Sequence, residues 1–221
     1  MSFYQRLLAQ TEGERNTFLA IPLFQAAMQG RVDRALYLAF LTQAYHHVKH
    51  TVPLLMACGA RVPERLEWLR VAIAHYIAEE TGHQEWILND IHHCGGDSEA
   101  VRKGPPSVET DVMVAYAWDT VLRRNPAGFF GMVLVLEGTS VNIATRAAHA
   151  IQQSLALPDE CFSYLTSHGA LDVSHMDFFE QLMNRLSEPD DQAAVIACAK
   201  VMYRLYGDIF RAVSGERRAA A

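Results

Sequence analysis

The chain has few of the features that mark secreted, membrane or nucleic-acid-binding proteins. Its four cysteines are widely spaced and form no CxxC pair, which favours reduced thiols in a cytosolic protein over a disulfide framework. Its longest strongly apolar run, FFGMVLVL, is less than half the length that spans a bilayer. The start, MSFYQRLLAQTEGER, carries charges and has no apolar segment of signal length. Basic residues form no run beyond the terminal GERRAAA, and the net charge is −6. We therefore expect a cytoplasmic protein without a nucleic-acid or membrane partner.

Apolar residues, in contrast, are abundant and follow a helical pattern. Of the 221 residues, 50% are hydrophobic, which is enough to fill the core of one domain. Apolar positions recur with the helical period, and no segment alternates as a strand would. We expect a single all-α domain over residues 1–221, with its core at about 10–213. The architecture expected is a compact bundle of roughly seven or eight helices.

Proline and glycine mark the expected helix ends. Pro22 kinks or breaks the second helix and Gly30 ends it, while Gly59 ends the segment that follows Pro53. The segment DSEAVRKGPPSVET is expected to be a surface loop. The expected helices lie at about residues 2–10, 16–29, 33–53 with an extension to 59, 63–92, 107–124, 127–153, 158–187 and 190–213.

One expected helix, SHGALDVSHMDFFEQL, turns polar residues toward the core. His168, Asp172 and His175 fall within an arc of roughly 60° when residues are placed about 100° apart. Leu171 and Phe179 share that side, so the arc faces inward. Two imidazoles and a carboxylate on a core-facing arc indicate a metal site.

The helix expected at 63–92 carries a second inward pair. Glu80 lies near the centre of its apolar stripe, and His83 lies at the edge of the stripe. Glu79 falls roughly 100° from the stripe centre and is expected to face solvent. The E-x-x-H spacing of Glu80 and His83 is the one that places carboxylate and imidazole on one metal in helical di-iron proteins.

A third anomaly is Glu137, which follows an almost wholly apolar run. An ionised carboxylate in such a helix costs several kcal/mol unless it is paired or binds a cation. No Lys or Arg lies within a turn or two of it in the sequence. Gly131 and Gly138 are expected to leave room for neighbouring backbone.

Together these residues form a set of candidate metal ligands that suits iron or manganese, since it offers carboxylate and imidazole without thiolate. Two iron ions are expected, with one ion or manganese as alternatives. Other interpretations stay open, because a single inward His is often a hydrogen-bonded core residue and E-x-x-H arises by chance. A metal-free polar pocket or an internal salt-bridge network would also use such residues. The candidate ligands are Glu80, His83, Glu137, His168, Asp172 and His175.

The segment YHHVKHT adds candidate pocket residues. Tyr45, His46 and His50, together with Tyr76 from the helix at 63–92, are candidates for lining a pocket. His46 or His47 could pair with His50 on a metal, but an exposed histidine-rich face is an equal alternative, so none is assigned as a ligand. The cysteines are interpreted as packing residues. The histidines expected at the surface or in caps are His75, His92, His93 and His149.

The order of these motifs, E-x-x-H, then a buried Glu, then H-x-x-x-D-x-x-H, resembles that of the haem-oxygenase-like di-iron oxidases. That group shares its fold with thiaminase II (TenA), the quinone-cofactor synthase PqqC and the protein CADD, and the resemblance covers about residues 10–213. It implies a haem-oxygenase-like (TenA/PqqC-like) bundle in which the six candidate ligands hold the metal. Glu79 could replace Glu80 as a ligand, and a mono-iron state is compatible with the pattern.

The resemblance implies a non-haem di-iron oxidase or oxygenase that uses O₂ to oxidise a small amine- or carboxylate-bearing substrate, and a homodimer. No catalytic side chain is assigned. One alternative is a metal-free thiaminase-like hydrolase of thiamin-related C–N bonds, but no cysteine occurs from Leu136 to His149, where that enzyme has its nucleophile. A PqqC-like enzyme needs no carboxylate-rich shell. A relative that binds a ligand without turnover is a further alternative.

Overall fold

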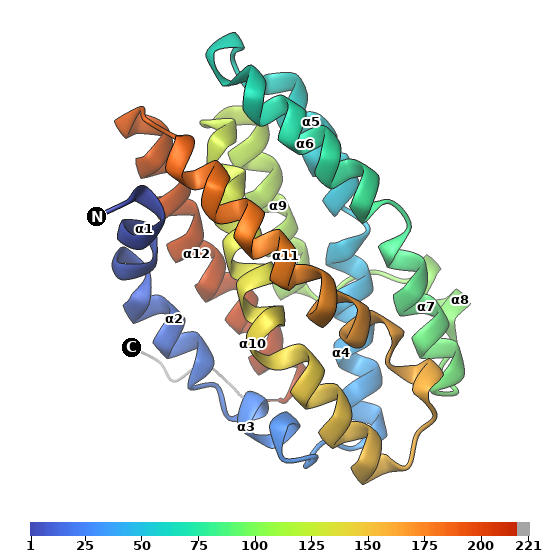
Figure 1. Cartoon of the computed structure of the whole chain (residues 1–221). Coiled ribbons are helices and arrows are strands. Elements are labelled where there is room, and N and C mark those ends of the chain that lie inside the picture. Colours follow the sequence, from blue (N-terminus) through green and yellow to red (C-terminus); the bar gives the residue numbers. More distant parts are fainter. Residues whose placement is uncertain (216–221) are drawn as a thin grey trace.

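The computed structural model describes residues 1–215, except the side chains of residues 142 and 168–174. In this part of the chain, twelve α-helices and three short 3₁₀ helices follow one another without a strand (Figure 1). The all-α class predicted from the sequence is confirmed. The α-helices are α1 Phe3–Gln10, α2 Glu12–Leu19, α3 Pro22–Met28, α4 Arg34–Val48, α5 Thr51–Arg61, α6 Glu67–Glu80, α7 His83–His93, α8 Ser98–Lys103, α9 Val108–Arg123, α10 Phe130–Leu155, α11 Ser163–Arg185 and α12 Pro189–Val213. The 3₁₀ helices are η1 Glu64–Leu66, η2 Pro126–Phe129 and η3 Asp159–Cys161.

The helices outnumber those expected because several expected helices are divided. The helix predicted at 16–29 breaks before Pro22, and the one that begins at Asp33 divides into α4 and α5. The prediction of one continuous helix over 63–92 was wrong, since Thr81 has an extended ψ of 117° and Gly82 a left-handed φ of 99°. Only glycine adopts that φ at little cost. The expected surface loop around residue 100 contains the short helix α8.

Gly59 does not end α5 as predicted, because the helix continues to Arg61. Gly59 is buried, and a Cβ built on it would lie 3.3 Å from the Ile73 Cγ2 atom of α6. This glycine therefore lets two helices approach each other, and its role is packing.

The long helix α10 runs through the middle of the bundle (Figure 1). It packs against α3, α11 and α12, while α5 packs on α6 and α4 packs on α7. A Cβ on Gly131 would lie 2.5 Å from the backbone of Val195 and of Ala199, so the predicted close approach is confirmed there. At Gly138 a Cβ would meet nothing within 4 Å among the described residues, which do not support the same prediction there. Side chains of α6 reach α10 and α11, since the ring of Tyr76 lies 6.4 Å from that of Phe130 and 5.6 Å from that of His175.

Among the described residues, no single helix is both long and apolar enough to cross a membrane. One pair of segments, Pro126–Val141 and Ile143–Leu155, meets the length and composition criteria jointly, with a bend of 43° between the two.

Candidate metal centre and adjoining cavity

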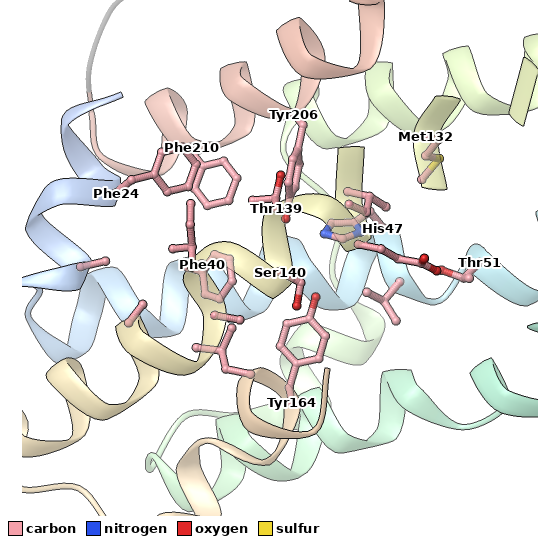
Figure 2. A pocket seen from close by; sticks show the side chains of 18 of the residues that line it. Phe24, Phe40, His47, Thr51, Met132, Thr139, Ser140, Tyr164, Tyr206 and Phe210 are labelled. Carbon is pink, nitrogen blue, oxygen red and sulfur yellow. The ribbon is translucent and has the colours of Figure 1, made fainter. Parts of the chain in front are cut away.

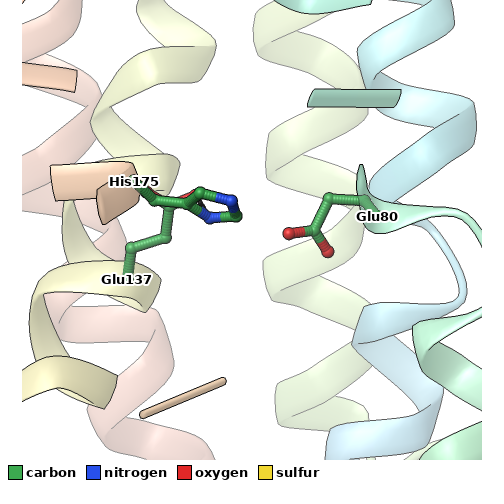
Figure 3. A group of neighbouring side chains, drawn as sticks. All are labelled: Glu80, Glu137 and His175. Carbon is green, nitrogen blue, oxygen red and sulfur yellow. Dashed lines mark ion pairs between the residues drawn. The ribbon is translucent and has the colours of Figure 1, made fainter. Parts of the chain in front are cut away.

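Three inward side chains meet between α6, α10 and α11. Glu80, Glu137 and His175 each offer one ligand atom, and these atoms all lie within 4.8 Å of one another (Figure 3). The His175 Nδ1 atom is 3.6 Å from the Glu137 Oε1 atom. Glu80 and His175 are buried and the Glu137 side chain is only 12% exposed. Residues 95 positions apart in the sequence therefore form one buried acidic site.

His83 joins this centre across the break between α6 and α7. Its Nδ1 atom lies 3.0 Å from the Glu80 Oε2 atom, and its ring stacks on Trp86 with the centroids 4.0 Å apart. Because Gly82 turns the chain after Thr81, His83 stands at the first position of α7 and still points back at Glu80. The E-x-x-H pair thus meets, although not on the continuous helix that the sequence predicted.

Glu79 is partly exposed, in line with the sequence prediction, but it also contacts the centre, which the prediction missed. Its side chain is 36% exposed, but its Oε2 atom is 3.1 Å from the His175 Nε2 atom and 3.1 Å from the His75 Nδ1 atom. The helical wheel missed this contact because α6 ends one residue later and a glutamate side chain reaches sideways around the helix. His75 itself is 62% exposed, as expected.

The side chains of His168 and Asp172 lie outside the described residues, so they stay predicted ligands. The four described members of the predicted ligand set are brought together, namely Glu80, His83, Glu137 and His175. His92, His93 and His149 are exposed, as expected.

The first turn of α11 is held by Asp90 of α7. The Asp90 carboxylate accepts hydrogen bonds from the backbone N–H groups of Ser163 at 3.1 Å and Tyr164 at 2.8 Å, and from the Ser163 hydroxyl. Phe162, at the N-cap position, supplies no side-chain acceptor, so Asp90 replaces the local cap. Burial raises the pKa of the Asp90 carboxyl above its ordinary value, and these hydrogen bonds act against that rise. The contact ties the helix that carries His175 to the helix that carries His83.

A cavity of about 160 Å³ adjoins the centre, with Glu80 and Glu137 in its wall. Tyr76, one of the predicted pocket residues, also lines it and is almost wholly buried. The imidazole that α4 contributes to this wall is His47. His47 is 3% exposed and packs edge-to-face on the ring of Tyr206 at 5.7 Å.

Tyr45, His46 and His50 are outside this wall, which corrects their prediction as pocket residues. The His46 Nδ1 atom is 3.2 Å from the Lys49 Nζ atom, and the ring of His50 packs on Trp118 at 6.4 Å. Burial, then Lys49, lowers the pKa of His46 to about 4 and also lowers the pKa of His50. His46 and His47 are both buried, on different sides of α4. The helical period therefore does not tell which of the two lines the cavity.

The cysteines carry no nucleophilic chemistry in this site. All four are buried free thiols, and burial raises the pKa of Cys58 and of Cys198 to about 12. Among the described residues, none of the four lines the cavity. Their interpretation as packing residues agrees with these contacts.

The donor set fits a metal of intermediate hardness. Two nearly buried carboxylates and an imidazole converge from three helices. His83 contacts Glu80, and Glu79 contacts His175. Carboxylates this close repel each other unless a cation lies between them. Oxygen and imidazole ligands suit iron or manganese, and two Glu with helix-borne His residues are the pattern of di-iron carboxylate proteins.

Comparisons with known proteins agree with this geometry. A family model described as iron-containing redox enzyme matches residues 38–207. No curated protein matches the sequence. A solved domain of unknown function with a heme oxygenase-like fold, from Shewanella denitrificans, has a TM-score of 0.85 and 22% identity over 96% of this chain and 92% of its own.

Two further structures share the fold at low identity. A TenA homologue from Pseudomonas syringae has a TM-score of 0.82 and 11% identity over 96% of this chain and 93% of its own. Heme oxygenase-1 from the cyanobacterium Synechocystis, solved with heme, has a TM-score of 0.75 and 10% identity over 97% of this chain and 93% of its own. The predicted haem-oxygenase-like, TenA-like fold is confirmed.

Proposed function

Since this chain belongs to the family of iron-containing redox enzymes, we propose that it is a non-haem di-iron oxidase or oxygenase, which uses O₂ to oxidise a small organic substrate. The observation that carries the proposal is the meeting of Glu80, Glu137 and His175 inside the bundle, with both glutamates in the wall of a largely apolar cavity. A buried acidic cluster has little structural use by itself, because desolvation of the charges outweighs their pairing.

In this proposal Glu80, Glu137 and His175 hold iron directly, together with His83 and the predicted ligands His168 and Asp172. Iron bound there would supply the electrons that reduce O₂. The Glu79 Oε2 atom lies 3.1 Å from the His175 Nε2 atom. Such a contact orients an imidazole ligand.

The remaining side chains position the substrate and exclude water. Tyr76 packs its ring 5.6 Å from the ring of His175 and closes the site beside Phe178. The cavity wall is largely aliphatic and aromatic, which favours displacement of water by an organic molecule. A substrate in the cavity would lie directly against the carboxylates of Glu80 and Glu137.

The cysteines argue against the thiaminase-like alternative. Cleavage of a thiamin C–N bond by this fold would need a nucleophilic thiol at the cavity, whereas burial raises the pKa of Cys58 and Cys198 to about 12. In the wall of the cavity the chain has Glu137 instead of a thiol.

Metal analysis after anaerobic loading with Fe(II) tests the proposal. We expect about two irons per chain, and a transient visible absorption on mixing with O₂. Glu137→Gln and His175→Ala should each lose most of the bound iron, because each removes a buried ligand atom. Manganese loading in parallel tests the alternative metal.

The matched controls are Glu160→Gln and His149→Ala, which change exposed residues and should keep full iron content. Circular dichroism would show that all four variants are folded. Full iron content in both Glu137→Gln and His175→Ala would overturn the proposal.

A further inference from the structure

The cavity beside the carboxylates is long and has two chemically different parts. Its wall follows α10 from Met132 to Ile151. The stretch from Glu137 to Ile151 alone corresponds to about 20 Å of helix axis at 1.5 Å per residue. An apolar cavity of about 150 Å³ accepts a molecule as large as benzene, so a volume of about 160 Å³ drawn out along a helix suits a narrow, linear molecule.

The far part of this cavity, which we name the apolar arm, is lined by carbon. It is formed by α3, α4, α10 and α12, and Figure 2 shows Phe24, Phe40 and Phe210 together at this end. The hydroxyl of Tyr37, which also lines the cavity, donates to the Cys161 backbone oxygen at 2.8 Å and so leaves no polar group unsatisfied. The arm includes Leu23, Phe24, Phe40, Ala147, Ile151 and Phe210.

Between the arm and the carboxylates lies a group of hydroxyl and imidazole side chains, the polar belt. Its members are His47, Ser140, Tyr164 and Tyr206, and Figure 2 shows the Tyr164 hydroxyl directed toward Ser140. Ser140 stands one helical turn after Glu137, and its Oγ atom is buried without a hydrogen-bond partner among the described residues. A buried hydroxyl in that state costs free energy unless a ligand satisfies it.

The charge of the wall restricts the head group. Among the described lining residues the charged ones are Glu80 and Glu137, and none is Lys or Arg. Residue 142 and residues 168–174, HGALDVS, contain no Lys or Arg either. The belt offers hydroxyl groups and an imidazole and contains no Lys or Arg, so it suits a hydroxyl, carbonyl or amide better than an anion.

We propose that the substrate is a straight-chain, mainly aliphatic molecule with one neutral hydrogen-bonding head, held head-first at the polar belt with its tail in the apolar arm. This substrate class rests on the proposed function for its chemistry, since the head and the carbon that bears it then lie nearest Glu137. The binding site itself follows from the cavity alone.

Calorimetric titration with 1-alcohols of increasing length tests the tail. The titrations use the metal-free protein and the Fe(II)-loaded protein under anaerobic conditions. Affinity should rise about fourfold per added methylene and stop rising when the arm is full. 1-Dodecanol should bind at least about tenfold more tightly than cyclododecanol, which has the same number of carbons in a compact ring.

Ala147→Phe fills the arm and should weaken 1-dodecanol at least about tenfold while leaving 1-octanol within about twofold. Thr145→Phe adds a phenyl ring to the exposed face of the same helix and should change neither. If Ala147→Phe does not fold, the smaller Ala147→Leu should shift the preferred length in the same direction. Ser140→Ala should weaken every alcohol about threefold, the effect of one neutral hydrogen bond.

The matching carboxylates test the head group. Tighter binding of laurate than of 1-dodecanol by the iron-loaded protein would overturn the neutral head. Equal affinity for 1-dodecanol and cyclododecanol, or no effect of Ala147→Phe and Ala147→Leu, would overturn the linear tail, even with normal iron content and O₂ reaction. Length-dependent alcohol binding by a protein that takes up no iron would support the site and overturn the proposed function instead.

Discussion

At the scale of single residues, neighbouring glutamates at the end of α6 have different surroundings. Glu80 is buried and offers an oxygen to the group formed with Glu137 and His175. Glu79 is partly exposed and contacts the Nε2 atom of His175, whose Nδ1 atom faces Glu137. In the proposed metal centre, Glu80 would bind the metal and Glu79 would stand behind an imidazole ligand, as in the carboxylate–histidine–metal contacts of other metal sites.

Glu79→Gln and Glu80→Gln should therefore differ in iron affinity. We expect a loss of about 10-fold for Glu79→Gln, because it weakens only the orientation of His175, and more than about 100-fold for Glu80→Gln. Competition with a chelator of known affinity measures both. A larger loss for Glu79→Gln would show that Glu79 is the ligand, the alternative that the sequence left open.

At the scale of elements, α10 carries the site and its packing sets where the site lies. Gly131 faces α12, where the backbone leaves no room for a Cβ. A Cβ on Gly138, one residue after Glu137, would meet nothing within 4 Å among the described residues. The two glycines are seven residues apart, which is about two helical turns, so they lie on the same side of α10. Close packing at Gly131 holds α10 against α12, and Glu137 further along the helix lines the cavity.

Gly131→Ala and Gly138→Ala should have opposite effects on the free energy of unfolding. We expect Gly131→Ala to cost roughly 2–3 kcal/mol, because the methyl group clashes with backbone that cannot move aside cheaply. Gly138→Ala should be neutral or should stabilise by up to about 1 kcal/mol, since alanine favours helix. Urea unfolding of both variants measures this. Equal destabilisation would contradict the packing argument.

At the scale of the whole molecule, a buried charged contact joins segments distant in sequence. The Asp191 carboxylate at the start of α12 is wholly buried and accepts from Arg65 at 2.5 and 3.0 Å and from Asn125 at 2.8 Å. These bonds link α12 to η1 before α6 and to η2 before α10. Hydrogen bonding from Arg65 lowers the pKa of the Asp191 carboxyl below its ordinary value of 3.8.

Because the folded pKa of Asp191 is lowered, its contribution to stability is present above pH 3.8 and is lost as the pH falls below that value. Asp191→Asn should lower the free energy of unfolding by about 2 kcal/mol at neutral pH. The loss is limited because solvent screens Arg65, which is half exposed. The difference from wild type should shrink as the pH approaches about 3.

Chemical denaturation at a series of pH values measures this difference. Asp119→Asn, which changes a partly exposed ion pair with Arg123 and Arg124, serves as the control and should cost less than about 1 kcal/mol. A cost of Asp191→Asn that is as large at pH 3 as at neutral pH would contradict the prediction.

The homodimer expected from the resemblance stays a prediction.

The sequence predicted the class of the fold and most of the side chains that meet at the candidate metal centre, but misplaced the details of both. Glu137 was found because an acidic residue in a long apolar helix has few other uses. Glu79 was missed because a helical wheel treats side chains as spokes and ignores their reach. His47 was missed in favour of its neighbours because all three imidazoles satisfy the same local pattern.

By itself the sequence determined that this protein is helical and that acidic and imidazole side chains lie inside it. Both follow from local periodicity, which fixes the buried face of a helix from a few turns. Only the tertiary structure decided that the chain turns at Gly82 so that His83 meets Glu80, that Asp90 caps α11, and that the cavity runs along α10. These features depend on how far apart the helices lie and which sides they share, and residues distant in sequence set those distances by packing.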